Sequence, residues 1–178
     1  MRIISGKYKG KKISAPKGLP TRPTTDKAKE SLFNILGSQM DLENIKVLDL
    51  FAGIGGISLE FISRGAESVL SVDKNYKCVK HMNDVKHELK INNWKIYKGD
   101  TFKVLKSYKE QFDLVFADPP YDLKGIEDIP DLVFENNFLK PGGTLIIEHS
   151  SDTQLSNVRN FVEQRTYSKV NFSIFQLQ

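Results

Sequence analysis

The stretch that decides the fold is residues 45–73, IKVLDLFAGIGGISLEFISRGAESVLSVD. Its first apolar run, Ile45–Phe51, is typical of a buried strand, and the glycines after it predict a tight turn. A helix is expected to follow this turn and to extend to Arg64, and a second apolar run, Ser68–Val72, predicts the next strand. Two buried strands that are joined by a helix form a unit of a parallel sheet, so the expected fold class is α/β.

The same alternation of strands and helices continues toward the end of the chain. Further strands are predicted at 94–97, 112–117, 144–148 and 166–177, and further helices at 75–90, 101–108, 128–138 and 153–162. The tail alternates apolar and polar residues, which is typical of antiparallel strands with one wet face. We therefore expect a doubly wound, mostly parallel sheet with an antiparallel terminal strand.

The residues before this pattern are predicted to form a small basic extension, residues 1–40, ahead of a main domain at 41–178. The extension is expected to contain a hairpin with strands at 2–5 and 11–14, followed by a helix from Thr24 or Thr25 to Gln39. Residues 1–30 carry a net charge of +7, which leaves −3 for the rest of the chain. This asymmetry favours binding of a polyanion, and a solvated basic tail is the alternative.

The composition of the 178 residues excludes several classes of protein. With 39% hydrophobic and 27% charged residues, the chain has too much apolar surface to remain disordered. The single cysteine excludes an internal disulfide, and three scattered histidines give no metal-ligand spacing, so we expect no metal. There is no apolar run of about 18 residues and no secretory signal, so we expect a soluble, cytoplasmic protein.

The first candidate site is the glycine-rich loop within Asp49–Gly56. Gly53 and Gly55 allow a tight turn and a close approach of a ligand, and ligands of open α/β sheets bind at the carboxyl ends of strands. Asp73 ends the second strand, 20 residues after Gly53, where an acidic residue can accept hydrogen bonds from ribose hydroxyls. The alternatives are a loop without a ligand and a helix cap at Asp73. Together the two features predict a nucleoside cofactor.

The second candidate site is Asp118-Pro119-Pro120-Tyr121, directly after the strand at 112–117. Asp118 and a backbone carbonyl held by the prolines can accept both hydrogens of an exocyclic amine. Tyr121 offers a ring that can stack on a base. The alternative is a Pro-Pro turn capped by aspartate. We interpret the tetrapeptide as a site for a planar base with an exocyclic amine.

This tetrapeptide resembles the signature of S-adenosylmethionine-dependent amino-methyltransferases that act on nucleic acid bases. The glycine loop is similar to their cofactor motif, with an acidic residue (Asp49) two before an aromatic one (Phe51), and then Gly-x-Gly. Upstream, residues 2–10 (RIISGKYKG), 22–26 (RPTTD) and 30–34 (ESLFN) resemble the RsmD-type 16S rRNA guanine-N2 methyltransferases. Ser58 stands where that family often has a third glycine.

The resemblance implies a seven-stranded class I methyltransferase sheet with S-adenosyl-L-methionine as cofactor. The implied reaction is methyl transfer to N2 of one guanine in a 16S rRNA hairpin loop, in the small ribosomal subunit or an assembly intermediate, by a monomer. The expected cofactor contacts are Asp49, Phe51, Gly53, Gly55, Asp73 and Asp100, and the expected base contacts are Asp118, Pro119, Pro120 and Tyr121. The expected RNA contacts are Lys7, Tyr8, Lys9, Arg22 and Thr24, of which Arg22 and Thr24, like Asp26, could instead cover the cofactor or start a helix.

Three other functions are alternatives at this point. An adenine-N6 methyltransferase on DNA or RNA would use the same tetrapeptide, although the upstream motifs argue against it. An NAD-dependent oxidoreductase would explain the glycine loop and Asp73 but not Asp118-Pro119-Pro120-Tyr121. A catalytically silent RNA-binding or assembly factor would use only the basic N-terminus.

Overall fold

The computed structural model describes residues 1–14, 18–19, 26–167 and 170–177. The strands are β1 (Lys46–Asp49), β2 (Ser68–Asp73), β3 (Trp94–Lys98), β4 (Phe112–Ala117), β5 (Leu139–His149), β6 (Phe161–Tyr167) and β7 (Val170–Gln176). The helices are α1 (Asp26–Gln39), α2 (Gly56–Ser63), α3 (Tyr76–Glu88), α4 (Thr101–Ser107) and α5 (Ile129–Glu135), with a short 3-10 turn, η1 (Ile126–Asp128), before α5.

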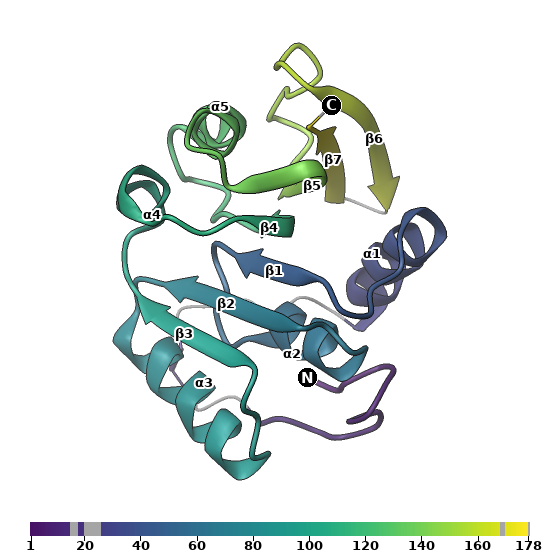
Figure 1. Ribbon diagram of the computed structural model, residues 1–178, viewed down its shortest axis with the longest axis vertical. Coiled ribbons are helices and arrows are strands. Elements are labelled where there is room, and N and C mark those ends of the chain that lie inside the picture. Colours follow the sequence, from purple (N-terminus) through teal and green to yellow (C-terminus); the bar gives the residue numbers. More distant parts are fainter. Residues whose placement is uncertain (15–17, 20–25, 168–169, 178) are drawn as a thin grey trace.

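All seven strands belong to one sheet, in the order β3-β2-β1-β4-β5-β7-β6 (Figure 1). The first five in this order run parallel, β7 is antiparallel to β5, and β6 is antiparallel to β7. The chain progresses outward from β1 in one direction to β3 and then in the other direction from β4, so the strand order reverses between β1 and β4. Ligands of open α/β sheets bind at such a reversal, outside the carboxyl ends of the strands. The predicted doubly wound sheet with antiparallel terminal strands is confirmed.

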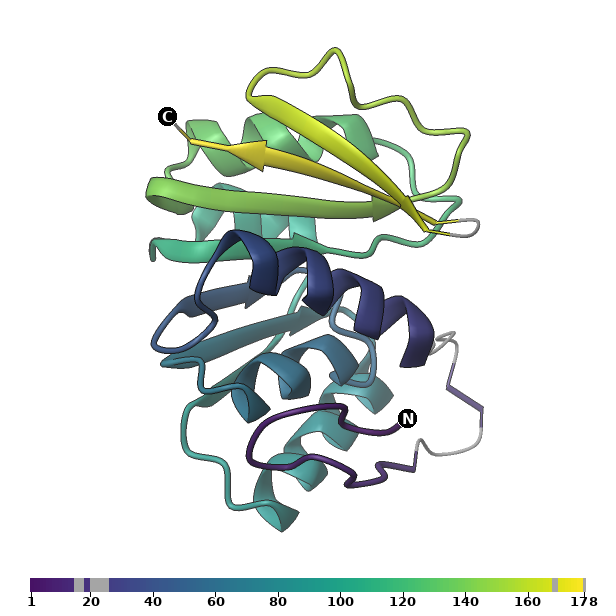
Figure 2. The ribbon, with the colours of Figure 1, turned by 90° about the vertical axis from the view of Figure 1, so that its right-hand side faces the viewer.

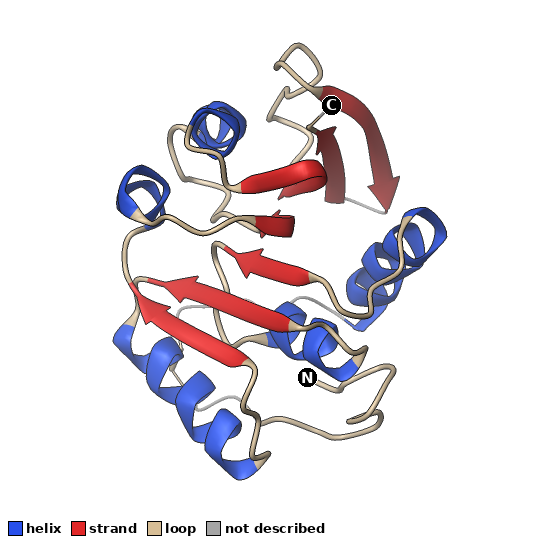
Figure 3. Ribbon diagram, viewed as in Figure 1, coloured by secondary structure: helices blue, strands red, loops and turns tan. Residues whose placement is uncertain are grey.

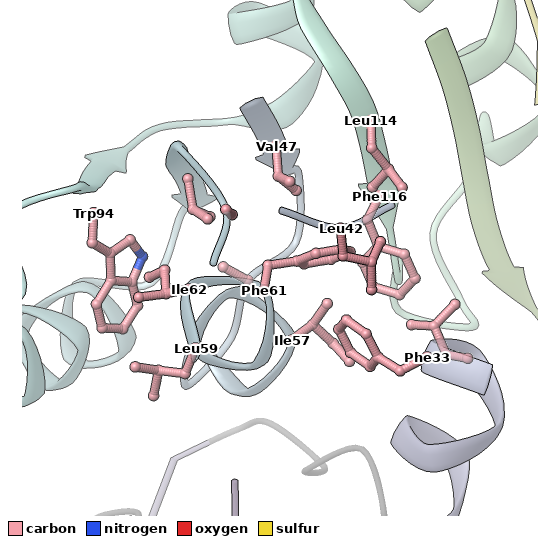
Figure 4. Packing of buried hydrophobic residues seen from close by; sticks show 14 of the residues in the cluster. Phe33, Leu42, Val47, Ile57, Leu59, Phe61, Ile62, Trp94, Leu114 and Phe116 are labelled. Carbon is pink, nitrogen blue, oxygen red and sulfur yellow. The ribbon is translucent and has the colours of Figure 1, made fainter. Parts of the chain in front are cut away.

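Helices cover both faces of the sheet (Figure 3). One hydrophobic cluster joins the sheet to α1, α2 and α3, and the rings of Phe33 and Phe61 meet edge to face there, with centroids 4.7 Å apart. Figure 4 shows this cluster with Trp94 at one end and Phe116 on the sheet. A second cluster joins the other face to α4 and α5 and includes Phe138. Hydrophobic cores therefore support the parallel strands on both faces of the sheet.

The N-terminal segment folds back on itself and packs beside α2 (Figure 2). The expected hairpin is reduced to a single antiparallel bridge, Arg2↔Lys12, although Ile3 and Ile13 are buried in the same cluster as α2. The helix expected from Thr24 or Thr25 is described from Asp26 onward, and its predicted start lies outside the described residues.

A buried carboxylate fixes this segment to α2. Glu60, on α2, is fully buried, and its two oxygens accept hydrogen bonds from the backbone N–H groups of Ile4 and Ser5, both at 2.9 Å. The buried Lys29 Nζ lies 3.6 Å from Glu60 Oε2, and Arg64 Nε donates to Glu60 Oε1 at 3.2 Å. The carboxylate therefore satisfies backbone donors that a short hairpin would otherwise leave unpaired.

Two predictions about the second half of the chain are wrong. Residues 153–162 were expected to form a helix, but they form turns that lead into β6, because their hydrogen bonds connect residues three apart. The strand expected at 144–148 is longer: β5 begins at Leu139 and includes Pro141-Gly142-Gly143, and α5 ends at Glu135, before the predicted end of the helix at 138. A shift in the β4–β5 register accommodates the extra residues.

Candidate active site at the carboxyl edge of the sheet

The glycine loop adopts a conformation that only glycine supports well. Gly53 and Gly55 have φ angles of 55° and 80°, in the left-handed region. A Cβ atom on Gly55 would lie 2.8 Å from Trp94 Cζ2 and 3.0 Å from Met82 Cγ. Gly55 is the N-cap of α2, and no side chain in the described part of the chain caps it, so the backbone N–H groups at the start of α2 have no side-chain acceptor among these residues.

Asp73 connects this loop to the end of β2. Its Oδ2 accepts a hydrogen bond from Gly53 N at 2.8 Å, and its Oδ1 accepts one from Asn75 N at 2.7 Å. Asn75, rather than Asp73, caps α3, because the Asn75 side chain accepts a bond from Lys77 N. Burial raises the pKa of Asp73, while the two backbone hydrogen bonds oppose that shift. An ionised carboxylate has about four acceptor positions. The bonds from Gly53 N and Asn75 N use two of those of Asp73, so the other two can accept hydrogen bonds from a ligand.

Asp49 is buried at the end of β1 and ends a chain of hydrogen bonds. Trp94 Nε1 donates to Ser71 Oγ at 2.7 Å, the Ser71 and Ser58 hydroxyls are 2.6 Å apart, and Ser58 Oγ donates to Asp49 Oδ2 at 2.6 Å. Asp49 Oδ1 is buried and has no hydrogen-bond partner among the described residues. Burial raises the pKa of Asp49 to about 7, and the charges of Asp118 and Asp73 add to this shift.

Ser58 therefore has a structural use that a glycine at this position could not supply. Its hydroxyl links the carboxylate of β1 to the hydroxyl of Ser71 on β2, and all three side chains are buried. Neither Ser71 nor Trp94 was predicted to belong to the site. A polar residue within an apolar strand, as at Ser71, is the sequence signal that could have indicated it.

Asp118-Pro119-Pro120-Tyr121 lies beside the glycine loop. β1 and β4 are paired up to Asp49 and Phe116, so Phe51 and Asp118, two residues farther along each strand, leave the sheet side by side. Asp118 is half-buried, Pro119 is buried, and Tyr121 is 56% exposed. The Pro120 carbonyl accepts a hydrogen bond from Leu123 N at 2.9 Å, which closes a turn after the tetrapeptide.

Glu148, near the end of β5, is a site residue that sequence reasoning missed. The β4–β5 pairing ends at Ala117↔Ile147, so the next residues along the two strands are Asp118 and Glu148. Glu148 is 5% exposed, and its Oε2 has no hydrogen-bond partner among the described residues. Burial, followed by the charge of Asp118, raises the pKa of Glu148 to about 8. A glutamate within the apolar run at 144–148 was the available signal.

The remaining predicted residues fall into two groups. Phe51 packs against the second core cluster, and Asp100 is exposed at the end of β3, where it caps α4 by accepting a bond from Lys103 N. Both lie at the same edge of the sheet as Asp49 and Asp73. The predicted RNA contacts Lys7, Tyr8 and Lys9 lie elsewhere, and Arg22 and Thr24 are outside the described residues.

Lys7, Tyr8 and Lys9 lie at the far end of α2 from the glycine loop. The backbone N–H of Lys7 donates to the Ser63 carbonyl at 2.7 Å, and that of Tyr8 donates to Ser63 Oγ at 2.9 Å. Since α2 extends from Gly56 to Ser63, about 10 Å of helix separates these residues from the loop.

The crevice is therefore an acidic site. Acidic side chains at the ends of all five parallel strands surround it: Asp49, Asp73, Asp100, Asp118 and Glu148. The described residues contain no group of three or more side chains that could hold a metal ion. None of the helices in the described part of the chain combines the length and apolar character of a membrane span. A cationic, nucleoside-containing ligand fits this charge and these backbone donors.

The comparisons with known proteins agree over the full length of the chain. Residues 1–176 match the family described as conserved hypothetical protein 95. YlbH of Bacillus subtilis (strain 168) is 34% identical, over 99% of this chain and 98% of its own length. The ribosomal RNA small subunit methyltransferase D of Haemophilus influenzae is 30% identical, over 99% of this chain and 93% of its own length.

A solved structure has the same fold. The yhhF protein of Escherichia coli superposes with a TM-score of 0.88 at 26% identity, covering 100% of this chain and 98% of that chain. The chain therefore belongs to the conserved hypothetical protein 95 family, the family of RsmD-type class I methyltransferases.

Proposed function

We propose that this protein transfers a methyl group from S-adenosyl-L-methionine to the exocyclic N2 of a guanine in a hairpin loop of 16S rRNA. The observation that carries the proposal is the position of Asp118-Pro119-Pro120-Tyr121 beside the glycine loop, at the reversal of strand order. The name of the Haemophilus influenzae relative, a ribosomal RNA small subunit methyltransferase, supports an rRNA substrate.

The residues at the carboxyl edge fit the proposed cofactor. The backbone donors at the start of α2, which no described side chain caps, suit a carboxylate, and Asp73 can offer acceptors to two vicinal ribose hydroxyls. Asp49 Oδ1, buried and without a partner among the described residues, can accept a bond from an ammonium group. Phe51 and Asp100 complete the proposed contacts. When bound, S-adenosyl-L-methionine supplies an activated methyl group on a sulfonium.

The chain's part in the reaction is to position the amine and to compensate its charge. A guanine amine is a poor nucleophile, because its lone pair is delocalised into the ring. Acceptors at Asp118 and at the Pro119 carbonyl would hold both N–H groups and offset the positive charge that develops on the nitrogen. Pro119 and Pro120 keep these acceptors still, and the exposed Tyr121 ring can stack on the base. Alignment of this kind is worth about 7–11 kcal/mol of the barrier.

Glu148 adds to this assignment. With a raised pKa of about 8, its carboxyl is protonated at neutral pH, so it does not add a second negative charge beside Asp118. The pair then carries less negative charge than two ionised carboxylates, and a protonated Glu148 can donate a hydrogen bond. The target base has to leave its stack to reach this position, which costs a few kcal/mol and is easiest in a loop.

The proposed substrate is the small ribosomal subunit or an assembly intermediate, and an enzyme with this substrate works in the cytoplasm, here as a monomer. Residues 1–40 would serve as the RNA-binding extension, with Lys7, Tyr8, Lys9, Arg22 and Thr24 as contacts, and residues 41–178 as the methyltransferase domain. The binding should weaken as salt rises.

The test is transfer of labelled methyl to unmodified small subunits and, separately, to protein-free 16S rRNA, followed by digestion to nucleosides. N2-methylguanosine at one position is the expected product. N6-methyladenosine would replace the guanine assignment with the adenine alternative. Cofactor binding without transfer to either substrate would contradict the rRNA assignment.

A further inference from the structure

The net charge of +4 is the sum of two basic segments and an acidic remainder. Residues 74–109 contain ten lysines and three acidic residues, which gives +7, the same net charge as residues 1–30. The rest of the chain then carries −10. The positive charge of this protein is therefore concentrated in two places, of which the N-terminal extension is only one.

The second basic segment forms one side of the molecule. It contains α3, β3 and α4, and β3 is an edge strand of the sheet. Nine of its ten lysines are exposed and Lys86 is half-buried. Lys80 pairs with Asp84 and Lys95 with Glu110, and the other eight lysines form no ion pair with an acidic residue in the described part of the chain. These charges are available to an external anion.

Two exposed tyrosines lie among the lysines at the carboxyl end of this side. Tyr76, the first residue of α3, is 63% exposed, and Tyr97 on β3 is 47% exposed. Lys98 Nζ lies 5.7 Å from the centroid of the Tyr76 ring. Tyr97 packs over Gly99, since a Cβ atom there would lie 2.6 Å from Tyr97 Cε1. We call Lys74, Tyr76, Lys77, Tyr97 and Lys98 the tyrosine–lysine edge.

This combination is typical of surfaces that bind single-stranded nucleic acid. Aromatic rings stack on bases of any sequence, and lysines neutralise the phosphates between them. Lysines on an edge strand also prevent pairing with other sheets, which is sufficient to explain Lys95. That role does not explain exposed aromatic rings, because exposed apolar surface on an edge promotes association. The exposed rings beside the lysines therefore favour a ligand of the nucleic acid class.

Its position suits the nucleotides around the reacting base. Lys74 and Tyr76 follow Asp73 at the end of β2, and Tyr97 and Lys98 precede Asp100 at the end of β3, so the edge borders the proposed cofactor site. Lys7 and Lys9, in contrast, lie at the far end of α2. The crevice itself is acidic and repels phosphate. An RNA strand that enters it therefore needs cations at its border.

We propose that the tyrosine–lysine edge is a second RNA-contact surface, which binds single-stranded nucleotides flanking the target base by stacking on Tyr76 and Tyr97 and by phosphate contacts to the three lysines. The proposal rests on the proposed rRNA substrate. RNA then contacts the protein at two basic surfaces, the N-terminal extension and this edge, and the proposed cofactor site lies between the edge and Asp118.

The experiment measures binding of a fluorescein-labelled oligouridylate, and of protein-free 16S rRNA, at a series of salt concentrations. The charge variant is Lys77→Gln with Lys98→Gln. Its matched control is Lys106→Gln with Lys109→Gln, two exposed lysines of the same basic segment, of which Lys106 is in the last turn of α4 and Lys109 follows this helix. The stacking variant is Tyr76→Ala, and its control is Tyr167→Ala, an exposed tyrosine on β6. Cofactor affinity checks that each variant is folded.

The charge variant should lower the slope of log affinity against log salt by about 1.4, which is the effect of losing two single-strand phosphate contacts. Tyr76→Ala should weaken binding by about tenfold, within the range that base stacking provides, and both controls should stay within about twofold of wild type. Equal losses in variants and controls would overturn the proposal. If wild type methylates RNA and the edge variants bind RNA as tightly as wild type, this surface alone is refuted. If wild type neither binds nor methylates RNA, the proposed function is refuted as well.

Discussion

Replacement of Gly55 by alanine tests the geometry of the glycine loop. Gly55 has a φ angle of 80°, which costs an L-residue about 1–2 kcal/mol. The added methyl group would lie 2.8 Å from Trp94 Cζ2 and 2.9 Å from Trp94 Cη2, and overpacking of this kind costs about 1–3 kcal/mol more. We therefore expect Gly55→Ala to lower the free energy of unfolding by about 2–5 kcal/mol.

Gly37→Ala is the matched control for this substitution. Gly37 lies within α1, its φ angle is not in the left-handed region, and no atom lies within 4 Å of an added Cβ. Removing a glycine from a helix interior should raise stability by about 0.5–1 kcal/mol, so the same chemical change has the opposite sign at the two positions.

Urea denaturation followed by circular dichroism measures both variants, and calorimetry measures their affinity for S-adenosyl-L-methionine. Gly55→Ala should lose stability and cofactor affinity together, because the loop is both a packing element and the proposed cofactor site. A Gly55→Ala protein that is as stable as wild type would refute the described contact between the loop and Trp94.

Three further predictions concern acidic side chains. Asp73→Ala should weaken cofactor binding by about 1–3 kcal/mol in calorimetry, because charged hydrogen bonds are lost; unchanged affinity would leave Asp73 only its bonds to Gly53 and Asn75. Glu60→Ala should lower the free energy of unfolding by about 3–5 kcal/mol, since it removes the nearer of the two carboxylates beside the buried Lys29 and leaves only Asp26, at 4.0 Å; a loss below 1 kcal/mol would contradict the buried cluster. The raised pKa of Glu148 means that the folded state keeps a proton that the unfolded chain releases between about pH 4.5 and 8. Stability should therefore fall as pH rises through this window, less steeply in Glu148→Gln, and parallel pH profiles would contradict the assignment.

Much of the fold could be predicted because the parallel strands are short, apolar runs between glycines and helices. The alternation from Ile45 to Val72 indicates the sheet class without any long-range information. The prediction was wrong at 153–162 because Leu155, Val158 and Phe161 recur every three residues, which resembles one face of a helix. In the structure, Val158 N bonds to Leu155 O and Phe161 N bonds to Val158 O, so successive turns produce the same spacing.

The candidate site was predictable where its residues follow strands directly. Asp49, Asp73 and Asp118 each end or follow a parallel strand, and the topology brings them to one edge. Glu148 was not predicted, because its position beside Asp118 depends on the β4–β5 register. This register shifts between Phe112 and Leu114, and the sequence does not indicate the shift. The same holds for Lys29 and its buried carboxylate partner, because charged residues on a helix are normally expected to face water.

The tyrosine–lysine edge shows a second limit of sequence reasoning. A charge balance over residues 31–178 gives −3 and conceals the +7 of residues 74–109. Placing these residues on α3, β3 and α4 separates a basic side from an acidic remainder.

The central claim is that Asp118 acts on the base and not on the cofactor. The direct measurement is single-turnover methyl transfer to 16S rRNA by Asp118→Ala, with cofactor affinity determined on the same preparation. We predict a loss of about 10²–10³-fold in rate, the cost of removing one preorganised group that stabilises transition-state charge, with cofactor affinity within about twofold of wild type. An equal fall in rate and cofactor affinity, or an unchanged rate, would contradict the assignment of Asp118 to the base.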